Sequence, residues 1–255
     1  MKQVILNPST LITGIDDATK CPVIGSIMIA GVVADPATVA LWHEKGVKDS
    51  KLIARKKRDE LAKLIKETAI AFSVRKLKPH MIDNKALNLN AWEMLVVCKI
   101  VEDLQKQTST ELGSVIIDNW EVSEKLFFER FNHLLSKETR AQLDALKVSL
   151  KRRNLRKVHF IPEHRADENH TIVGAASILA KSASDLEYER LKKRYGNFGS
   201  GSPGDPKTRL YVWKHRHKPT PIIRTSWNTF KTLSIIDSIE QDWLFIARNN
   251  KKQSF

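Results

Sequence analysis

The chain has 255 residues, 42% hydrophobic and 28% charged, which suits one large domain or one domain with a smaller appendage. Its net charge of +14 favours a polyanionic partner, usually nucleic acid, although a merely basic protein has the same balance. Two cysteines exclude a disulfide framework, and neither a signal peptide nor a membrane helix of about 20 apolar residues is recognisable. We therefore expect a soluble, intracellular, cytoplasmic protein that does not enter a membrane.

The first predicted strand covers residues 11–15 and stops at two adjacent carboxylates, Asp16 and Asp17. The apolar pattern resumes in a second predicted strand, residues 23–33. Two acids in such a hairpin cost several kcal/mol if they are buried without partners, and a metal ion would remove that cost. The alternative interpretation is an Asp-Asp turn that joins two strands.

The next segments are predicted from periodicity and turn residues. A helix from residue 87 onward carries Cys98 in its apolar stripe, which makes that cysteine a core residue. The other predictions are a turn at Asp35-Pro36, a polar loop over 46–51, an amphipathic helix over 55–69 and a strand over 70–78.

A second apolar strand, residues 113–118, also ends in a carboxylate, Asp118. A helix over 171–195 begins with small residues that permit close packing on a sheet, and it carries Lys181 and Asp185 on one face. The remaining predictions are a phenylalanine-rich helix after Glu121, a basic helical segment over 137–157, a strand over 158–161, a glycine-rich loop over 196–204, a helix capped by Asp205-Pro206, and a helix from Trp227 to about Arg248.

Alternating strands and helices indicate an α/β domain. If the two acid-ended strands are neighbours, their ends lie ~5 Å apart and the carboxylates can converge. Oxygen ligands of this type select Mg²⁺ or Mn²⁺, and two such ions support phosphodiester cleavage. The candidate ligands are Asp16, Asp17, Asp118 and Asp185.

The chain resembles the ribonuclease HII family, in its archaeal and eukaryotic branch, through motifs that occur in the family's order. The opening stretch GIDDATKCPVIGS, residues 14–26, is similar to the family's G-I-D-E-A-G-R-G-P-V-I-G-P. The other matches are Val47-Lys48-Asp49-Ser50-Lys51, Leu87-Asn88, Ile116-Ile117-Asp118, Ala166-Asp167, Gly174 to Lys181 with Asp185, Tyr195 to Gly201, Asp205 to Thr208, and Arg224-Thr225-Ser226-Trp227.

This resemblance implies a ribonuclease H-like fold, a mixed five-stranded sheet flanked by helices, with a catalytic domain over 10–215 and a C-terminal helical segment over 216–255. It implies an endonuclease that cuts RNA paired to DNA and leaves a 3′-hydroxyl and a 5′-phosphate. We expect the protein to be a monomer. By motif match, Asp16, Asp17, Asp118 and Asp185 are the catalytic and metal-binding residues. The expected nucleic-acid-binding residues are Lys20, Lys48, Lys51, Lys181, Ser202 and Arg224.

The chain departs from the family pattern in the motifs that recognise a single ribonucleotide. Thr19-Lys20-Cys21 replaces G-R-G, which reads a ribose 2′-hydroxyl through backbone groups, and Ser202 replaces the tyrosine that stacks on the next nucleotide. Asp17 replaces a glutamate, which shortens its reach by ~1.5 Å. We therefore expect a metal-dependent nuclease that recognises single embedded ribonucleotides weakly. The alternatives are a catalytically weak nucleic-acid-binding paralogue and a nuclease of the same superfold that acts on DNA junctions.

Overall fold

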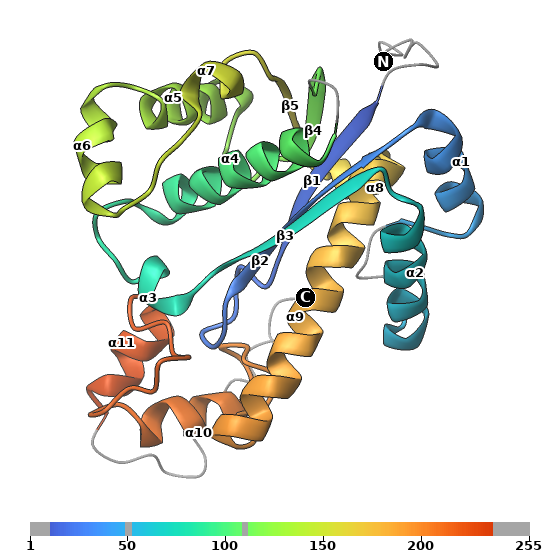
Figure 1. Cartoon of the computed structure of the whole chain (residues 1–255). Helices are drawn as coiled ribbons and strands as arrows, with labels where there is room; N and C mark the ends of the chain where they lie inside the picture. The colour runs from blue at the N-terminus through green and yellow to red at the C-terminus, as the bar shows by residue number, and fades with distance from the viewer. Residues whose placement is uncertain (1–10, 49–52, 109–111, 237–255) are drawn as a thin grey trace, which may run out of the picture. The chain divides into compact units, whose positions relative to one another are not determined.

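The computed structural model describes residues 11–48, 53–108 and 112–236, and five strands in them form one mixed sheet (Figure 1). The sheet order is β3-β2-β1-β4-β5. β1 pairs antiparallel with β2 and parallel with β4, and β4 pairs parallel with β5. The predicted α/β class with a mixed five-stranded sheet is confirmed. The strands are β1 (Ile12–Ala18), β2 (Ile27–Ala34), β3 (Ala71–Leu77), β4 (Ser114–Asp118) and β5 (His159–Glu163).

The helices agree with most of the predicted segments. Asp205 caps α10 by accepting the Lys207 N–H, as predicted. The turn predicted at Asp35-Pro36 is wrong, because Asp35 caps a helix instead. The helices are α1 (Pro36–Glu44), α2 (Arg55–Thr68), α3 (Pro79–Ile82), α4 (Leu89–Gln107), α5 (Glu124–Leu134), α6 (Glu138–Ala145), α7 (Arg152–Leu155), α8 (Ala166–Asn169), α9 (Thr171–Tyr195), α10 (Pro206–Lys214) and α11 (Asn228–Ser234).

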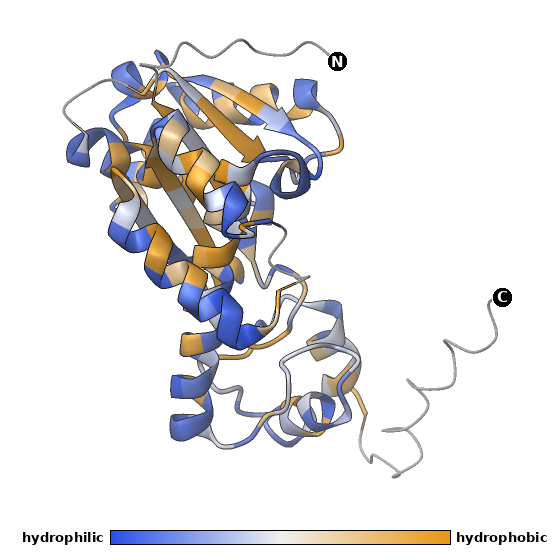
Figure 2. Ribbon diagram, turned by 90° about the vertical axis from the view of Figure 1, so that its right-hand side faces the viewer, coloured by the Kyte–Doolittle hydropathy of each residue, from blue (hydrophilic) through white to orange (hydrophobic). Residues whose placement is uncertain are grey.

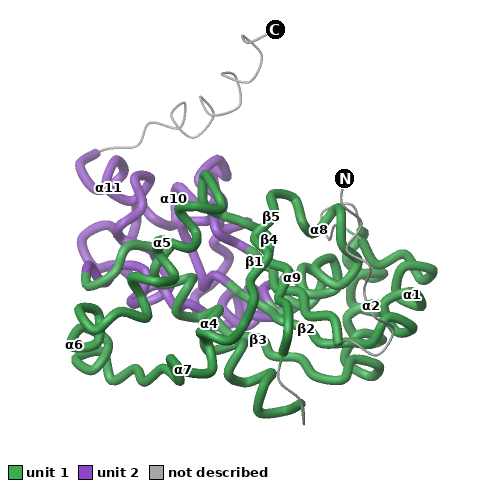
Figure 3. Tube along the Cα trace, turned by 90° about the horizontal axis from the view of Figure 1, so that it is seen from above, with its two compact units in different colours: residues 1–18, 28–76, 86–183 green, residues 19–27, 77–85, 184–255 purple. Residues whose placement is uncertain are grey.

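The chain divides into two compact units, coloured separately in Figure 3. Helix α9 passes from the first unit into the second after Ala183. The division predicted at residue 215 stays a prediction. The helix predicted from Trp227 to about Arg248 is wrong in its length, because α11 ends at Ser234 with Ile235 as its C-cap, within the described residues. Unit 1 consists of Met1–Ala18, Met28–Lys76 and Ala86–Ala183, and unit 2 of Thr19–Ile27, Leu77–Lys85 and Ser184–Phe255.

One face of the sheet in unit 1 packs against α1, α2 and α9. The small residues at the start of α9 let the helix approach closely, and a Cβ on Gly14 would lie 2.6 Å from the Ile172 backbone. The strands are mostly orange in Figure 2, and they share the apolar core with the helices that cover them. The core on this face includes Met28, Ala30, Val32, Ala34, Trp42, Leu61, Ile65, Val173, Ala176 and Ala180.

The opposite face of the sheet packs against α4 and α5. A Cβ on Gly31 would lie 2.5 Å from Ile100 Cγ2, so α4 also lies close to the strands. The rings of Phe131 and Phe160 join α5 to β5, with centroids 4.9 Å apart. Cys98 is fully buried here, and burial raises the pKa of its thiol, which confirms its prediction as a core residue.

Unit 2 has an apolar core of its own. It joins the segment after β1 to the loop after α9 and to the last helices, and it includes Val23, Ile24, Phe198, Tyr211, Val212, Ile222, Ile223 and Leu233. None of the helices in the described part of the chain combines the length and apolarity needed to cross a membrane.

Candidate active site

Asp16 and Asp17 lie inside β1 rather than after it. The strand continues because it pairs with β2 through Asp16 with Ala30, Asp17 with Ile29, and one further pair. The prediction that this strand stops at residue 15 was therefore too short, and the Asp-Asp turn was wrong. The pairing partner, which the local sequence does not reveal, keeps the backbone extended past the two acids.

Asp16 and Asp118 lie level with each other on neighbouring strands. The parallel register of β1 and β4 pairs Ile15 with Ile117, so the next residue of each strand is one of the two acids. Ile116 packs in the core on the α9 side, and side chains two apart share a face, so Asp118 is on that side too. Ala30, the partner of Asp16, packs on the same side. The sheet thus brings two predicted ligands together on one face.

Asp16 is buried close to other acidic side chains. Only 5% of the residue is exposed. Burial, followed by the charges of Asp17, Asp118 and Asp167, raises the pKa of Asp16 well above its usual range, and a hydrogen bond from Ser177 opposes the rise. A cation at this point would reverse the effect of the neighbouring carboxylates. The donor set therefore fits a divalent metal ion in its chemistry.

Residues outside the predicted set of metal ligands complete the surroundings. Asp118 Oδ1 accepts the Ala166 N–H at 2.9 Å, which fixes the start of α8, and Asp167 follows with 4% exposure. Glu163 pairs with Asp118 in the register of β4 and β5. Burial works to raise the pKa of Glu163, but hydrogen bonds from His170 and Asn169 outweigh it and lower that pKa.

Asp17 and Asp185 differ in their placement from the pair of Asp16 and Asp118. Strand alternation directs Asp16 and Asp17 to opposite faces of the sheet. Among the described residues, no group of three or more acidic, histidine or cysteine side chains is arranged as a metal site. Asp185 is half-buried on the part of α9 that belongs to unit 2. The roles of Asp17 and Asp185 as ligands therefore stay predictions from the motif.

Two of the expected nucleic-acid-binding residues lie in unit 1. Lys48 is exposed, and its Cα lies 3.3 Å from the point that a Cβ on Gly174 would occupy, about one helical turn before Ser177. Lys181 is half-buried on α9. Lys51 lies outside the described residues. The structure thus places Lys48 near the helix that covers Asp16.

The segment that replaces the family's G-R-G belongs to unit 2 and is held by Arg224. This arginine is fully buried, and its guanidinium donates to the carbonyls of Thr19, Lys20 and Gly25 at 2.8, 2.7 and 2.8 Å. The Trp227 ring lies 5.0 Å from the guanidinium carbon. These bonds give Arg224 a role in holding the loop, and its expected role in nucleic-acid binding stays a prediction.

The glycine-rich loop after α9 is tied to the same segment. Gly201 accepts the Val23 N–H at 2.9 Å and has φ +80°, a conformation that suits glycine. Its own N–H donates to the Thr208 hydroxyl at 2.9 Å. Ser202 follows and is exposed, while Lys20 is half-buried. The predicted substrate-reading residues Lys20 and Ser202 therefore stand on loops of one compact unit.

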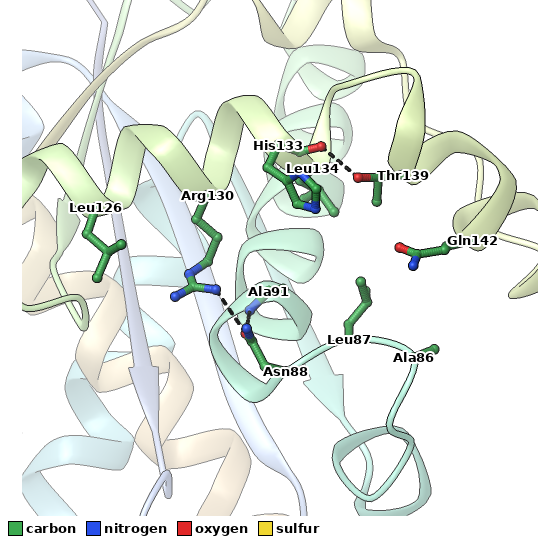
Figure 4. A pocket seen from close by; sticks show the side chains of 10 residues that line it. All are labelled: Ala86, Leu87, Asn88, Ala91, Leu126, Arg130, His133, Leu134, Thr139 and Gln142. Carbon is green, nitrogen blue, oxygen red and sulfur yellow. Dashed lines mark hydrogen bonds between the residues drawn. The ribbon is translucent and has the colours of Figure 1, made fainter.

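A separate pocket of about 340 Å³ opens in unit 1 beside the start of α4 (Figure 4). Asn88 caps α4 by accepting the Ala91 N–H at 2.9 Å, and it also accepts a hydrogen bond from Arg130 at 3.0 Å. Arg130 is paired with Glu121 as well. The conspicuous Leu87-Asn88 motif thus has a structural role, because it starts a helix and anchors α5 to α4.

Comparisons with known proteins assign the chain to a family. Residues 13–230 match the profile of the family described as ribonuclease HII. The chain belongs to the ribonuclease HII family. Ribonuclease HII of Thermococcus onnurineus is 36% identical over 226 residues, with 87% of this chain and 89% of the relative covered. Ribonuclease HII of Methanococcus maripaludis is 36% identical over 242 residues, with 92% and 91% covered.

The solved structures agree with this family. The crystal structure of ribonuclease H2 from Pyrococcus horikoshii matches with a TM-score of 0.70 and 28% identity, and covers 88% of this chain and 97% of that one. Membership supports the coarse activity of a ribonuclease H, an endonuclease that acts on an RNA strand and depends on divalent metal. The resemblance of the motifs to this family, and the ribonuclease H-like fold it implied, are confirmed.

Proposed function

We propose that this member of the ribonuclease HII family hydrolyses the RNA strand of RNA–DNA hybrids by a two-metal mechanism with Mg²⁺ or Mn²⁺. The observation that carries the proposal is the position of Asp16, which is buried and lies level with Asp118 on one face of the sheet. The pKa of Asp16 is raised by this burial and by the neighbouring carboxylates, which agrees with that position. Clustered buried carboxylates destabilise a fold unless a cation compensates them. A site for catalytic cations accounts for their presence here.

The proposed roles of the chain's residues rest partly on their placement and partly on the motif match. Asp16 and Asp118 would hold the ions, together with Asp17 and Asp185 by motif match. Such ions, when bound, lower the pKa of a water molecule and stabilise the leaving oxygen of a phosphodiester. Lys48 is exposed and suited to neutralise a substrate phosphate.

Weakened recognition of a single embedded ribonucleotide is the second part of the proposal. Cys21 is exposed and places a side chain where the family motif has a glycine. Ser202 is exposed and cannot stack on a base, an interaction worth ~1–3 kcal/mol. Continuous RNA offers many phosphate and ribose contacts and depends less on this one subsite. We therefore expect faster cleavage of long hybrids than of a DNA duplex with one ribonucleotide.

Replacing Asp118 by Asn tests the catalytic assignment. We expect the variant to lose detectable cleavage of a hybrid in Mg²⁺ and in Mn²⁺, and to bind the hybrid at least as tightly, because one negative charge is removed. The matched control is Asp144→Asn, an exposed acid on α6 that is paired with Arg140. If the unaltered protein binds the hybrid but cuts nothing, the binding paralogue is the better description.

The same assay, mapped at nucleotide resolution, tests substrate choice. The substrates are a continuous hybrid, a DNA duplex with one ribonucleotide, and an all-DNA junction. Stronger cleavage of the single-ribonucleotide duplex would overturn the weakened recognition. Cleavage of the DNA junction alone would favour a different nuclease activity on this fold.

A further inference from the structure

Thr19 has an unusual backbone conformation for its residue type. Its φ is +67°, in the left-handed region that β-branched residues rarely adopt. The motif that the chain resembles has glycine at this position, and glycine adopts this conformation without strain. Something else in the chain must therefore hold Thr19 in place.

The holding contacts run through two side chains of unit 2. The Thr19 hydroxyl donates to the Ser26 carbonyl at 2.9 Å, which closes the loop of residues 19–26. The Ser26 N–H and hydroxyl then donate to the two carboxylate oxygens of Glu187, at 3.0 and 2.8 Å. The side chain at position 19 is thus connected to α9 through Ser26.

Both departures from the motif are needed for this connection. A glycine at position 19 has no hydroxyl to donate, and the proline that the motif carries at position 26 has no N–H. Ser26 supplies both an N–H and a hydroxyl to Glu187, while Thr19 supplies the hydroxyl that binds Ser26. The two substitutions together therefore hold a backbone conformation that glycine would adopt without support. Arg224 fixes the carbonyls on the loop's other side, and Tyr188 donates to the Ile24 carbonyl at 2.7 Å.

We propose that Thr19, Ser26 and Glu187 are positioning residues that preset the substrate-reading loop in the conformation glycine would adopt. The inference rests on the proposed function, because it takes this loop to be the one that meets the ribose. The backbone of Lys20 and Cys21 is then presented in a fixed path although both glycines are absent. Weaker recognition of a single ribonucleotide therefore comes from the side chain of Cys21 and the missing tyrosine, while the path of the loop is kept.

The test compares Glu187→Gln, Thr19→Gly and the double variant, with Glu189→Gln, an exposed acid of the same helix, as control. Amide hydrogen exchange of the 19–26 segment and the KM and kcat on a continuous hybrid are measured for each. Glu187→Gln should speed exchange in the segment and raise KM about fivefold, with kcat changed less than about twofold. Adding Thr19→Gly should restore the KM of the unaltered protein, since glycine needs no support there.

Two results would overturn the inference. One is unchanged exchange of the segment in Glu187→Gln, and the other is a raised KM that Thr19→Gly does not reverse. A general loss of stability would lower the unfolding temperature and would not be rescued by glycine. If the unaltered protein cuts no RNA, the proposed function fails, while the exchange measurement still decides whether the three residues hold the loop.

Discussion

The ionised carboxylate of Asp16 lowers the stability of the metal-free folded protein. Its folded-state pKa is raised, so the proton is bound more tightly in the folded protein than in the unfolded chain. Its contribution to stability therefore becomes unfavourable as pH rises above the usual value of 3.8 toward the folded pKa, and stays unfavourable above that. The charged site costs the metal-free protein stability at neutral pH.

Asp16→Asn should consequently stabilise the metal-free protein. We expect a higher unfolding temperature at pH 8 in the presence of a chelator, with each kcal/mol worth about 2–4 °C, and a smaller gain at pH 5. Thermal unfolding followed by circular dichroism measures both, and Asp144→Asn serves as the surface control. A lower unfolding temperature at pH 8 would show that the Asp16 charge is compensated within the protein.

Substitution of Asp17 tests whether the length of its side chain limits the activity. Asp17→Glu restores the length that the family motif carries at this position and extends the carboxylate by ~1.5 Å. We expect kcat/KM on a continuous hybrid to rise, and Asp17→Asn to lower it, when both are assayed in Mg²⁺ and Mn²⁺. A glutamate variant that is less active than the unaltered protein would mean that the surroundings have adapted to the shorter side chain.

At the level of residues, the sequence predicted the acids that follow apolar runs in strands. Apolar runs are visible in a local pattern, and the motifs supplied the order. The end of β1 is not visible there, because pairing with β2 keeps the strand extended past both acids. Asp167, Glu163 and Ser177 were not recognised as neighbours of Asp16 and Asp118, because three different elements carry them. Their proximity arises only from the register of β4 with β5 and from the packing of α9 on the sheet.

Among the elements, α1 depends on a cap that the sequence analysis interpreted as a turn. Asp35 accepts the Thr38 N–H at 2.7 Å, and this hydrogen bond lowers the pKa of Asp35. Asp35→Ala should destabilise the protein by about 1 kcal/mol at pH 7, and Asp35→Asn, which can also cap, by much less. Because the pKa is lowered on folding, the stabilisation by Asp35 is lost as pH falls through the folded value. Urea unfolding at pH 7 measures the difference, and equal losses in both variants would argue against the cap.

Helix boundaries were predictable where a local signal exists. Gly196, with φ +84°, ends α9 at the position expected for a C-terminal glycine. The basic segment over 137–157 was predicted as one helical stretch, but it forms α6 and α7 with a break between them. Lys147 adopts φ +56° there, and the Val148 N–H donates to the Leu143 carbonyl, a helix end made without glycine. The residue pattern around Lys147 contains no signal that predicts this helix end.

For the whole molecule, the net charge of +14 predicts that binding to a hybrid is strongly dependent on salt. The inactive Asp118→Asn variant allows the affinity to be measured without cleavage. Each phosphate contact that is removed should reduce the slope of log affinity against log salt by about one unit. The slope therefore identifies which cations contact the substrate.

Two sets of cations in unit 1 make different predictions for that slope. Lys48 lies near α9 about one turn from Ser177, so Lys48→Ala should reduce the slope by about one unit. Lys147, Lys151 and Arg153 precede β5, whose far end holds Glu163 level with Asp118. The 5 residues of β5 span about 16 Å, beyond the screening length of about 8 Å at physiological salt. Replacing these three cations by alanine should therefore change the affinity for a short hybrid less than Lys48→Ala does. A larger change would make the basic segment a main phosphate contact and would extend the substrate path along the whole of β5.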